Sequence, residues 1–109
     1  MGTKVKYAPS IFDGQDDTEC FASKYEERSE NCGKGYINRH EVFFGRNRNN
    51  SKKYGCWVNL CQACHEIVHF GKDPTLKDKL KQECEERFVE LHSQEEFDRI
   101  FRPHNDYQR

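Results

Sequence analysis

The chain has 109 residues and is very polar, with 34% charged and 34% hydrophobic residues and a mean hydropathy of -1.12. This length suits a single domain whose thin core is expected to need extra stabilisation from disulfides or a metal. No stretch is apolar enough to predict a membrane span, and residues 1–6 lack the apolar segment of a secretory signal, so we expect a cytoplasmic protein. In that reducing compartment, six cysteines favour metal binding over disulfides.

The net charge of -1 conceals an uneven distribution of charge along the chain. Between Gly33 and Cys64 there are six Lys and Arg residues and one acid, Glu41, so this segment carries +5 and the remainder -6. Positive charge gathered in one segment indicates a polyanionic partner such as nucleic acid.

Two strands and a short helix are predicted in the middle of the chain. Aromatic and β-branched residues predict a strand over residues 36–44, and residues 56–60 predict a second, antiparallel strand. Segment 45–55 is rich in Gly, Asn and Lys and is predicted to be a connection, too polar for the interior of an element. A short helix is expected over residues 65–70, ending at Gly71.

Two further helices are predicted in the last third of the chain. Asp73 is a good N-cap and Pro74 fits the first helical position. An apolar stripe at helical spacing then follows, made of Leu76, Leu80, Cys84, Phe88 and Leu91. Ser93-Gln94-Glu95-Glu96 is a capping box, which predicts a last helix ended by Pro103.

The cysteines are concentrated around one metal-like motif, Cys61-Gln62-Ala63-Cys64. A Cys-x-x-Cys pair presents two thiolates to one tetrahedral zinc, which needs two more ligands. Cys20 and Cys32 are the upstream candidates; Cys20 can instead be a buried thiol, with Cys56 as its replacement. Cys84 lies in the apolar stripe and is expected to pack in the core.

Three histidines near this motif suggest a second metal site. His65 and His69 stand four positions apart, so on a helix both imidazoles share one face. With His40 they can hold a divalent cation (Mg²⁺, Mn²⁺, Ni²⁺ or Zn²⁺) that keeps positions open for a phosphate oxygen and water. Glu41, Glu66 or a metal-bound water is then expected to activate the attacking hydroxide. In the simpler interpretation, His65 replaces a cysteine at the zinc and His69 faces solvent.

The basic residues between the two predicted strands are candidates for contacts with nucleic acid. Such contacts bind phosphates and orient the ligand without reading its sequence. A solvated loop is the more common fate of such a charge run. The candidate residues are Arg46, Arg48, Lys52 and Lys53.

These motifs resemble the HNH endonucleases, the zinc-containing branch of the His-Me finger (ββα-metal) nucleases, over about residues 20–70. Arg39-His40-Glu41-Val42 resembles the family's strand motif, Cys61-Gln62-Ala63-Cys64-His65 its Cys-x-x-Cys-His motif, and His69 the downstream metal ligand of some members. More narrowly, segments 40–48, 51–55 and 96–101 are similar to small HNH-like proteins of phages and prophages of Gram-positive bacteria.

The resemblance implies an α+β fold and a single HNH-like domain over residues 1–109. An N-terminal arm (1–19) would precede a ββα-metal core stapled by zinc (20–70) and a pair of C-terminal helices (73–103). It implies single-metal hydrolysis of phosphodiester bonds in DNA, or in RNA, inside a bacterial host cell.

The same resemblance implies roles for two polar residues of the first strand. His40 falls on the metal-ligand position, and Glu41 falls where the family has a His as general base. A shift of one residue would make His40 the base and leave Arg39 at a ligand position, which is chemically worse. The alternative function is a zinc-binding DNA-binding or accessory protein without catalysis, and a protein-interaction module is the third interpretation.

Overall fold

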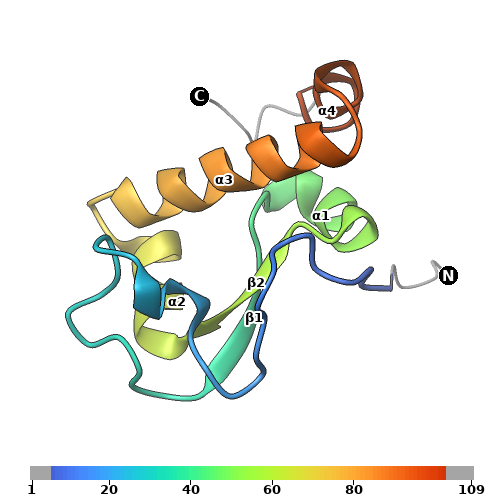
Figure 1. Cartoon of the computed structure of the whole chain (residues 1–109). Helices are drawn as coiled ribbons and strands as arrows, with labels where there is room; N and C mark the ends of the chain where they lie inside the picture. The colour runs from blue at the N-terminus through green and yellow to red at the C-terminus, as the bar shows by residue number, and fades with distance from the viewer. Residues whose placement is uncertain (1–5, 103–109) are drawn as a thin grey trace, which may run out of the picture.

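The structure is a computed structural model and describes residues 6–102. It is a small α+β fold with one antiparallel pair of strands and four α-helices in the described part of the chain (Figure 1). In chain order the elements are η1 (Phe21–Lys24), β1 (Ile37–Glu41), η2 (Gly45–Asn47), α1 (Arg48–Tyr54), β2 (Trp57–Cys61), α2 (Gln62–Phe70), α3 (Thr75–Leu91) and α4 (Gln94–Phe101).

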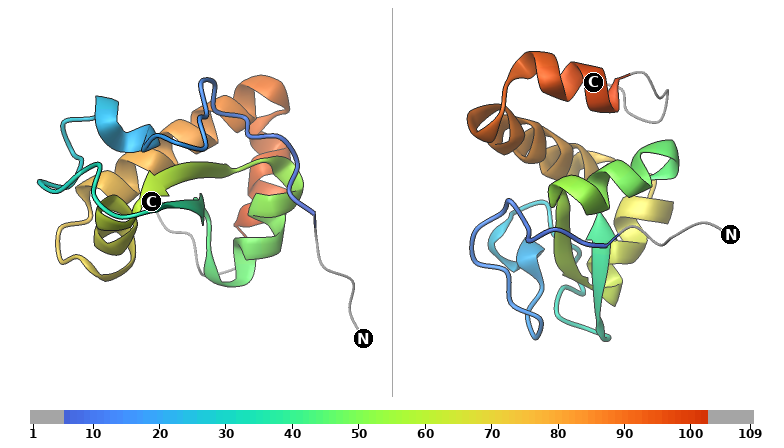
Figure 2. Two further views of the ribbon diagram at one scale, coloured as in Figure 1. Left: turned by 90° about the horizontal axis from the view of Figure 1, so that it is seen from below. Right: turned by 90° about the vertical axis from the view of Figure 1, so that its right-hand side faces the viewer.

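The hairpin of β1 and β2 lies at the centre of the molecule. The two strands pair antiparallel, with His40 opposite Val58 and Glu41 opposite Trp57. All five residues of β2 are buried, because the hairpin is covered on more than one side. Figure 2 shows η1 and the N-terminal segment on one side of the hairpin and α2 on the other, while α3 crosses from α2 to α4.

The polar segment 45–55 is not the irregular connection that its composition predicted. It forms the short 3-10 helix η2 and the helix α1. The side chain of Ser51 is fully buried, donates to the backbone oxygen of Phe43 and accepts from the backbone nitrogen of Phe43. Tertiary hydrogen bonds therefore stabilise a helix whose sequence has weak helical propensity.

Two asparagines join this segment to the end of α4. The Nδ2 atom of Asn47 donates to the backbone oxygen of Phe101 at 3.0 Å, and that of Asn50 donates to the oxygen of Ile100 at 3.1 Å. Carbonyl groups in the last turn of a helix lack intrahelical partners, so these side chains satisfy them. The link ties the C-terminal helix to the hairpin.

The N-terminal segment is bound to the turn that follows α1. Gly55 ends α1 in the left-handed conformation, with a φ of 73°. Its backbone oxygen accepts from the nitrogen of Ile11 at 2.9 Å, and a Cβ at this position would lie 2.1 Å from the backbone oxygen of Pro9. Only glycine allows both this conformation and this close approach.

Gly55→Ala is therefore expected to be much more destabilising than an alanine at a comparable glycine in open space. Left-handed backbone costs about 1–2 kcal/mol for a residue with a side chain, and the clash with Pro9 adds to that cost. Gly14 is the matched control, because its φ is 77° and a Cβ added there would have nothing within 4 Å. Equal losses of unfolding free energy in urea for both variants would contradict the close packing of the N-terminal segment.

Helix α4 begins where its predicted cap places it and α3 begins one residue later than predicted, whereas α2 begins earlier than expected. The thiol of Cys61 accepts from the nitrogen of Cys64, so α2 begins at Gln62 rather than at residue 65. The Oδ1 atom of Asp73 accepts from the nitrogen of Thr75 at 3.0 Å, and the Ser93 hydroxyl accepts from the nitrogen of Glu96 at 3.1 Å. The predicted stop at residue 103 lies outside the described residues.

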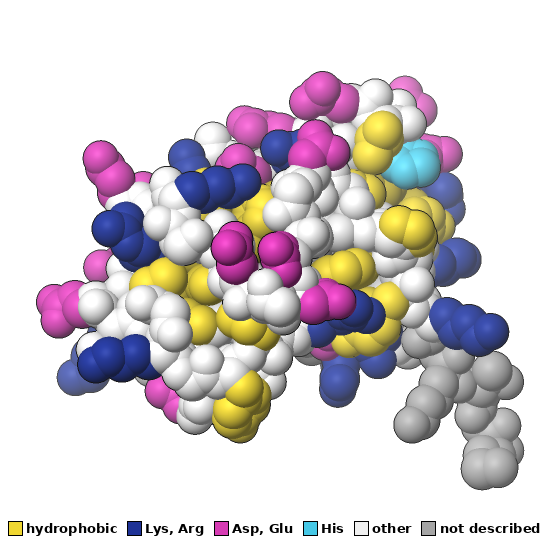
Figure 3. Space-filling model, turned by 60° about the horizontal axis from the view of Figure 1, so that its bottom comes forward, with side chains coloured by type: hydrophobic (Ala, Val, Ile, Leu, Met, Phe, Trp, Pro, Cys, Tyr) yellow, Lys and Arg dark blue, Asp and Glu magenta, His cyan; other side chains and the backbone are white. Residues whose placement is uncertain are grey.

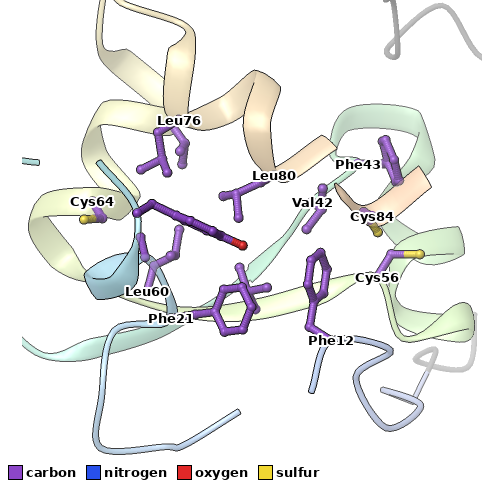
Figure 4. Packing of buried hydrophobic residues seen from close by; sticks show 14 of the residues in the cluster. Phe12, Phe21, Val42, Phe43, Cys56, Leu60, Cys64, Leu76, Leu80 and Cys84 are labelled. Carbon is purple, nitrogen blue, oxygen red and sulfur yellow. The ribbon is translucent and has the colours of Figure 1, made fainter. Parts of the chain in front are cut away.

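The predicted apolar stripe of α3 forms much of the core (Figure 4). Leu76, Leu80, Cys84 and Phe88 are buried, but Leu91, the last residue of the predicted stripe, is 63% exposed because α3 ends there. Within residues 6–102, none of the helices has both the length and the apolar character needed to cross a membrane.

The C-terminal helices close the core around a group of aromatic rings. Phe97 of α4 packs against Phe43 and Phe88, with ring centroids 5.4 and 5.7 Å apart. These rings meet at mutual angles of 66°, the edge-to-face arrangement that aromatic pairs prefer. They hold α3 and α4 on the hairpin.

Candidate metal centres

Four cysteines from three separate segments meet in one cluster. Cys20 immediately precedes η1, Cys32 lies in the turn before β1, Cys61 ends β2 and Cys64 lies in the first turn of α2. Their sulfur atoms all lie within 4.8 Å of one another. The cluster can hold a metal ion such as zinc.

The chemistry and spacing of this cluster fit a structural zinc. A zinc–sulfur distance of about 2.3 Å in a tetrahedral site corresponds to sulfur atoms about 3.8 Å apart. Backbone nitrogens also donate to the sulfurs: Gly33 to Cys61 at 3.2 Å and Ser29 to Cys64 at 3.4 Å. Such outer hydrogen bonds orient the ligands and stabilise the thiolate form.

Because the four thiols lie so close together, the pKa values of individual cysteines move in opposite directions. A hydrogen bond from the Cys64 thiol lowers the pKa of Cys20 to about 5, and the same bond raises the pKa of Cys64. Burial raises the pKa of Cys32 to about 11. A divalent cation would offset the repulsion between the thiolates, so we expect zinc binding to release protons.

The remaining two described cysteines lie apart from this cluster. Cys56, which immediately precedes β2, and Cys84 of α3 are both fully buried and interact with each other (Figure 4). The core position expected for Cys84 is therefore found. Cys20, rather than the alternative Cys56, is the residue that the fold brings to Cys32, Cys61 and Cys64.

Three histidines form a second cluster, between β1 and α2. His65 and His69 share one face of α2, as their spacing predicts, and His40 reaches them from β1. The ring centroid of His40 is 5.1 Å from each of the other two, and those two are 4.6 Å apart. His65 thus belongs to this cluster and not to the cysteines.

The histidine cluster also has the dimensions of a metal site. One ring nitrogen from each residue lies within 4.8 Å of the others, and the Nε2 atoms of His65 and His69 are 3.0 Å apart. Metal–nitrogen distances of about 2.1 Å correspond to nitrogens about 3.4 Å apart. His40 is only 2% exposed, and its buried Nδ1 has no hydrogen-bond partner among the described residues. A buried nitrogen without a partner is costly unless a ligand engages it.

The electrostatic surroundings keep these imidazoles neutral. Burial lowers the pKa of His40 well below its usual value, and the neighbouring His65 and His69 lower it further. Burial also lowers the pKa of His65 and of His69, although the Glu41 carboxylate opposes the shift at both. Neutral imidazole is the form that binds metals, so all three side chains are ready to coordinate at neutral pH.

Glu41, the candidate base, is held by two hydrogen-bond donors. The Tyr7 hydroxyl donates to one carboxylate oxygen and Arg48 Nε donates to the other at 3.0 Å, while the side chain is 11% exposed. Burial and the hydrogen bond to Glu41 raise the pKa of Tyr7 to about 12, so the phenol remains a donor. The Arg39 guanidinium lies 4.4 Å from the Tyr7 ring and 4.0 Å from the Trp57 ring, and these two rings meet edge to face.

The four basic candidates lie on η2 and α1 rather than in a loop. Arg46 and Lys53 are exposed, Arg48 pairs with Glu41, and the Lys52 amine lies 5.3 Å from the Tyr7 ring. All four therefore follow β1 closely in the chain, and two of them lie beside Glu41 or its partner Tyr7. Sequence reasoning found their proximity to the strand but not the helix that carries them.

Several residues at the edge of the histidine cluster were not foreseen. The Phe44 ring lies 4.9 Å from His69 and 5.9 Å from His40, and the Lys81 amine lies 5.1 Å from the Phe44 ring. The charge of Lys77 acts on His69. Lys77 and Lys81 are four positions apart, so the helical period could have placed them on one face of α3, but not beside the histidines.

No protein-family model, curated protein or solved structure matches the chain. Function must therefore be inferred from the residues of the two clusters and from their geometry.

Proposed function

We propose that the chain is a metal-dependent DNA endonuclease of the HNH type, with β1, β2 and α2 as its ββα-metal finger. The observation that carries the proposal is the convergence of His40, His65 and His69, whose ligand atoms lie within 4.8 Å of one another. The cysteine cluster supports it, because a structural zinc beside the finger is what the resemblance implies. On the same resemblance, we expect a phage or prophage gene product that acts in the bacterial cytoplasm.

In this proposal His40, His65 and His69 would hold a divalent cation (Mg²⁺, Mn²⁺, Ni²⁺ or Zn²⁺), which would supply Lewis-acid stabilisation to the phosphoryl group and to the leaving oxygen. Glu41 accepts a proton from the attacking water while the phosphorus–oxygen bond to the leaving nucleotide breaks. Each carboxylate oxygen has two lone pairs, so the bonds from Tyr7 and Arg48 orient Glu41 and leave room for that proton. Arg46, Lys52 and Lys53 bind flanking phosphates.

A second function is favoured by one observation at the same site. Both oxygens of Glu41 already accept hydrogen bonds, from Tyr7 and from Arg48. A carboxylate held in this way suits a chain that retains the fold and the zinc but binds DNA without cutting it. The two functions differ in whether phosphodiester bonds are broken.

Glu41→Gln separates these functions in a plasmid-nicking assay with each of the four metals. General-base catalysis contributes about 10²–10⁴-fold, so we expect nicking to fall by that factor while plasmid binding is retained. Glu83→Gln is the matched control, because Glu83 also accepts from a tyrosine hydroxyl, that of Tyr25, but lies outside both clusters; this variant should cut at the wild-type rate. Wild-type protein that binds plasmid but cuts under none of the metals would favour the non-catalytic function.

A further inference from the structure

Phe70 is the most exposed large hydrophobic residue in the described part of the chain, at 84%. It is the last residue of α2 and follows His69 directly, with ring centroids 5.9 Å apart. The core gains nothing from a ring in this position. A single exposed aromatic is common on protein surfaces, so its meaning here depends on the groups that lie beside it.

Phe44 provides a second aromatic surface at the same edge. It is half-buried, packs against His40 and His69, and has the Lys81 amine 5.1 Å from its ring. Phe44 therefore continues the apolar border of the histidine cluster from α2 toward α3.

Two lysines of α3 lie at the same edge of the histidine cluster as these rings. Lys77 and Lys81 lie one helical turn apart on α3, and the Lys81 amine lies 5.1 Å from the centroid of the Phe44 ring. Lys72 is exposed two residues after Phe70. Figure 3 shows one face of the molecule, on which acidic and basic side chains are mixed.

We propose that the α2–α3 rim, made of Phe70, Phe44, Lys77 and Lys81, binds single-stranded DNA next to the histidine cluster. One unpaired base stacks on Phe70, and the two lysines contact backbone phosphates. Aromatic faces combined with cations bind unpaired strands, whereas the bases of a duplex are stacked on each other and offer no free face. The inference rests on the proposed function and names its substrate: DNA with unpaired nucleotides beside the bond that is cut.

The test is the affinity of the zinc-loaded protein for a fluorescent thymidine oligonucleotide, measured by anisotropy without a second metal, so that nothing is cut. Stacking of one base contributes about 1–3 kcal/mol. Phe70→Ala should therefore weaken single-strand binding by about tenfold, at about 1.4 kcal/mol per factor of ten. Phe70→Trp should restore it, and binding of a duplex of the same length should change less than twofold. Lys77→Gln should reduce the slope of log affinity against log salt concentration by about the amount that one phosphate contact contributes.

Tyr36→Ala is the matched control, because Tyr36 is also an exposed aromatic (69%) but lies at the cysteine end of the hairpin. Wild-type affinity of Phe70→Ala for the single strand, or an equal loss for the duplex, would overturn the proposal. Tighter binding of an RNA oligonucleotide with the corresponding base sequence would also overturn the proposal. The assay measures binding and not cleavage, so its result does not depend on whether the chain cuts DNA. Single-strand binding at the α2–α3 rim can therefore be supported in an inactive protein and refuted in an active nuclease.

Discussion

Cys64→Ala is expected to leave the chain largely unfolded, even when zinc is present. Cys64 is fully buried, and its sulfur is one of the four that lie within 4.8 Å of one another. A structural zinc supplies about 10–16 kcal/mol of apparent binding free energy, whereas a folded domain retains a net stability of only about 5–15 kcal/mol. When one of the four thiolates is removed, the zinc-binding free energy that is lost is expected to exceed the net stability of the folded domain. Circular dichroism and urea unfolding of the zinc-loaded proteins measure the effect.

Cys84→Ala is the matched control, because Cys84 is equally buried but lies outside the cysteine cluster. Its loss should cost about 0.5–3 kcal/mol, which is typical of a single core substitution, and should leave a cooperative unfolding transition. If the two variants unfold cooperatively with similar free energies, the cysteine cluster is not a structural metal site.

His65→Ala is expected to lower the rate of DNA cleavage by about 10³-fold while the protein stays folded. A bound cation supplies several kcal/mol of transition-state stabilisation, and a loss of ~4 kcal/mol corresponds to about 10³-fold in rate. His65 is preferable to His40 for this test. His40 is almost completely buried, so its removal would also leave a cavity in the core.

His92→Ala controls for the loss of an imidazole elsewhere. His92 stacks on Phe88, pairs with Glu96 at 3.3 Å and stands outside the histidine cluster. It should cut plasmid at close to the wild-type rate. Cleavage by His65→Ala at the rate of this control would show that the imidazoles do not take part in the reaction.

The parts of the site that depend on local spacing could be predicted from the sequence. Cys61 and Cys64 flank the start of a helix, and His65 and His69 share a face of it, because the helical period fixes both relations. The hydrogen bonds of Asp73 and Ser93 at the starts of α3 and α4 are likewise local, since each side chain accepts from a backbone nitrogen two or three residues later, although Pro74 and not Asp73 is the N-cap of α3.

The parts that depend on contacts across the fold could not be predicted in this way. The choice of Cys20 over Cys56 depends on where the segment before β1 lies. Helix α1 was missed because its stability comes from partners far along the chain, as in the bond from Asn47 to Phe101. The bond from Tyr7 to Glu41 joins residues 34 positions apart, and no period in the sequence indicates it.

Nicking of supercoiled plasmid, measured while a second metal is added to protein that already holds one zinc per chain, tests the central claim most directly. That claim is that His40, His65 and His69 hold a cation that drives phosphodiester hydrolysis. We predict no nicking before the second metal is added, nicking that saturates at one further equivalent, and its loss in His65→Ala. Absence of nicking with saturating Mg²⁺, Mn²⁺, Ni²⁺ and Zn²⁺, or equal nicking by His65→Ala, would contradict the account.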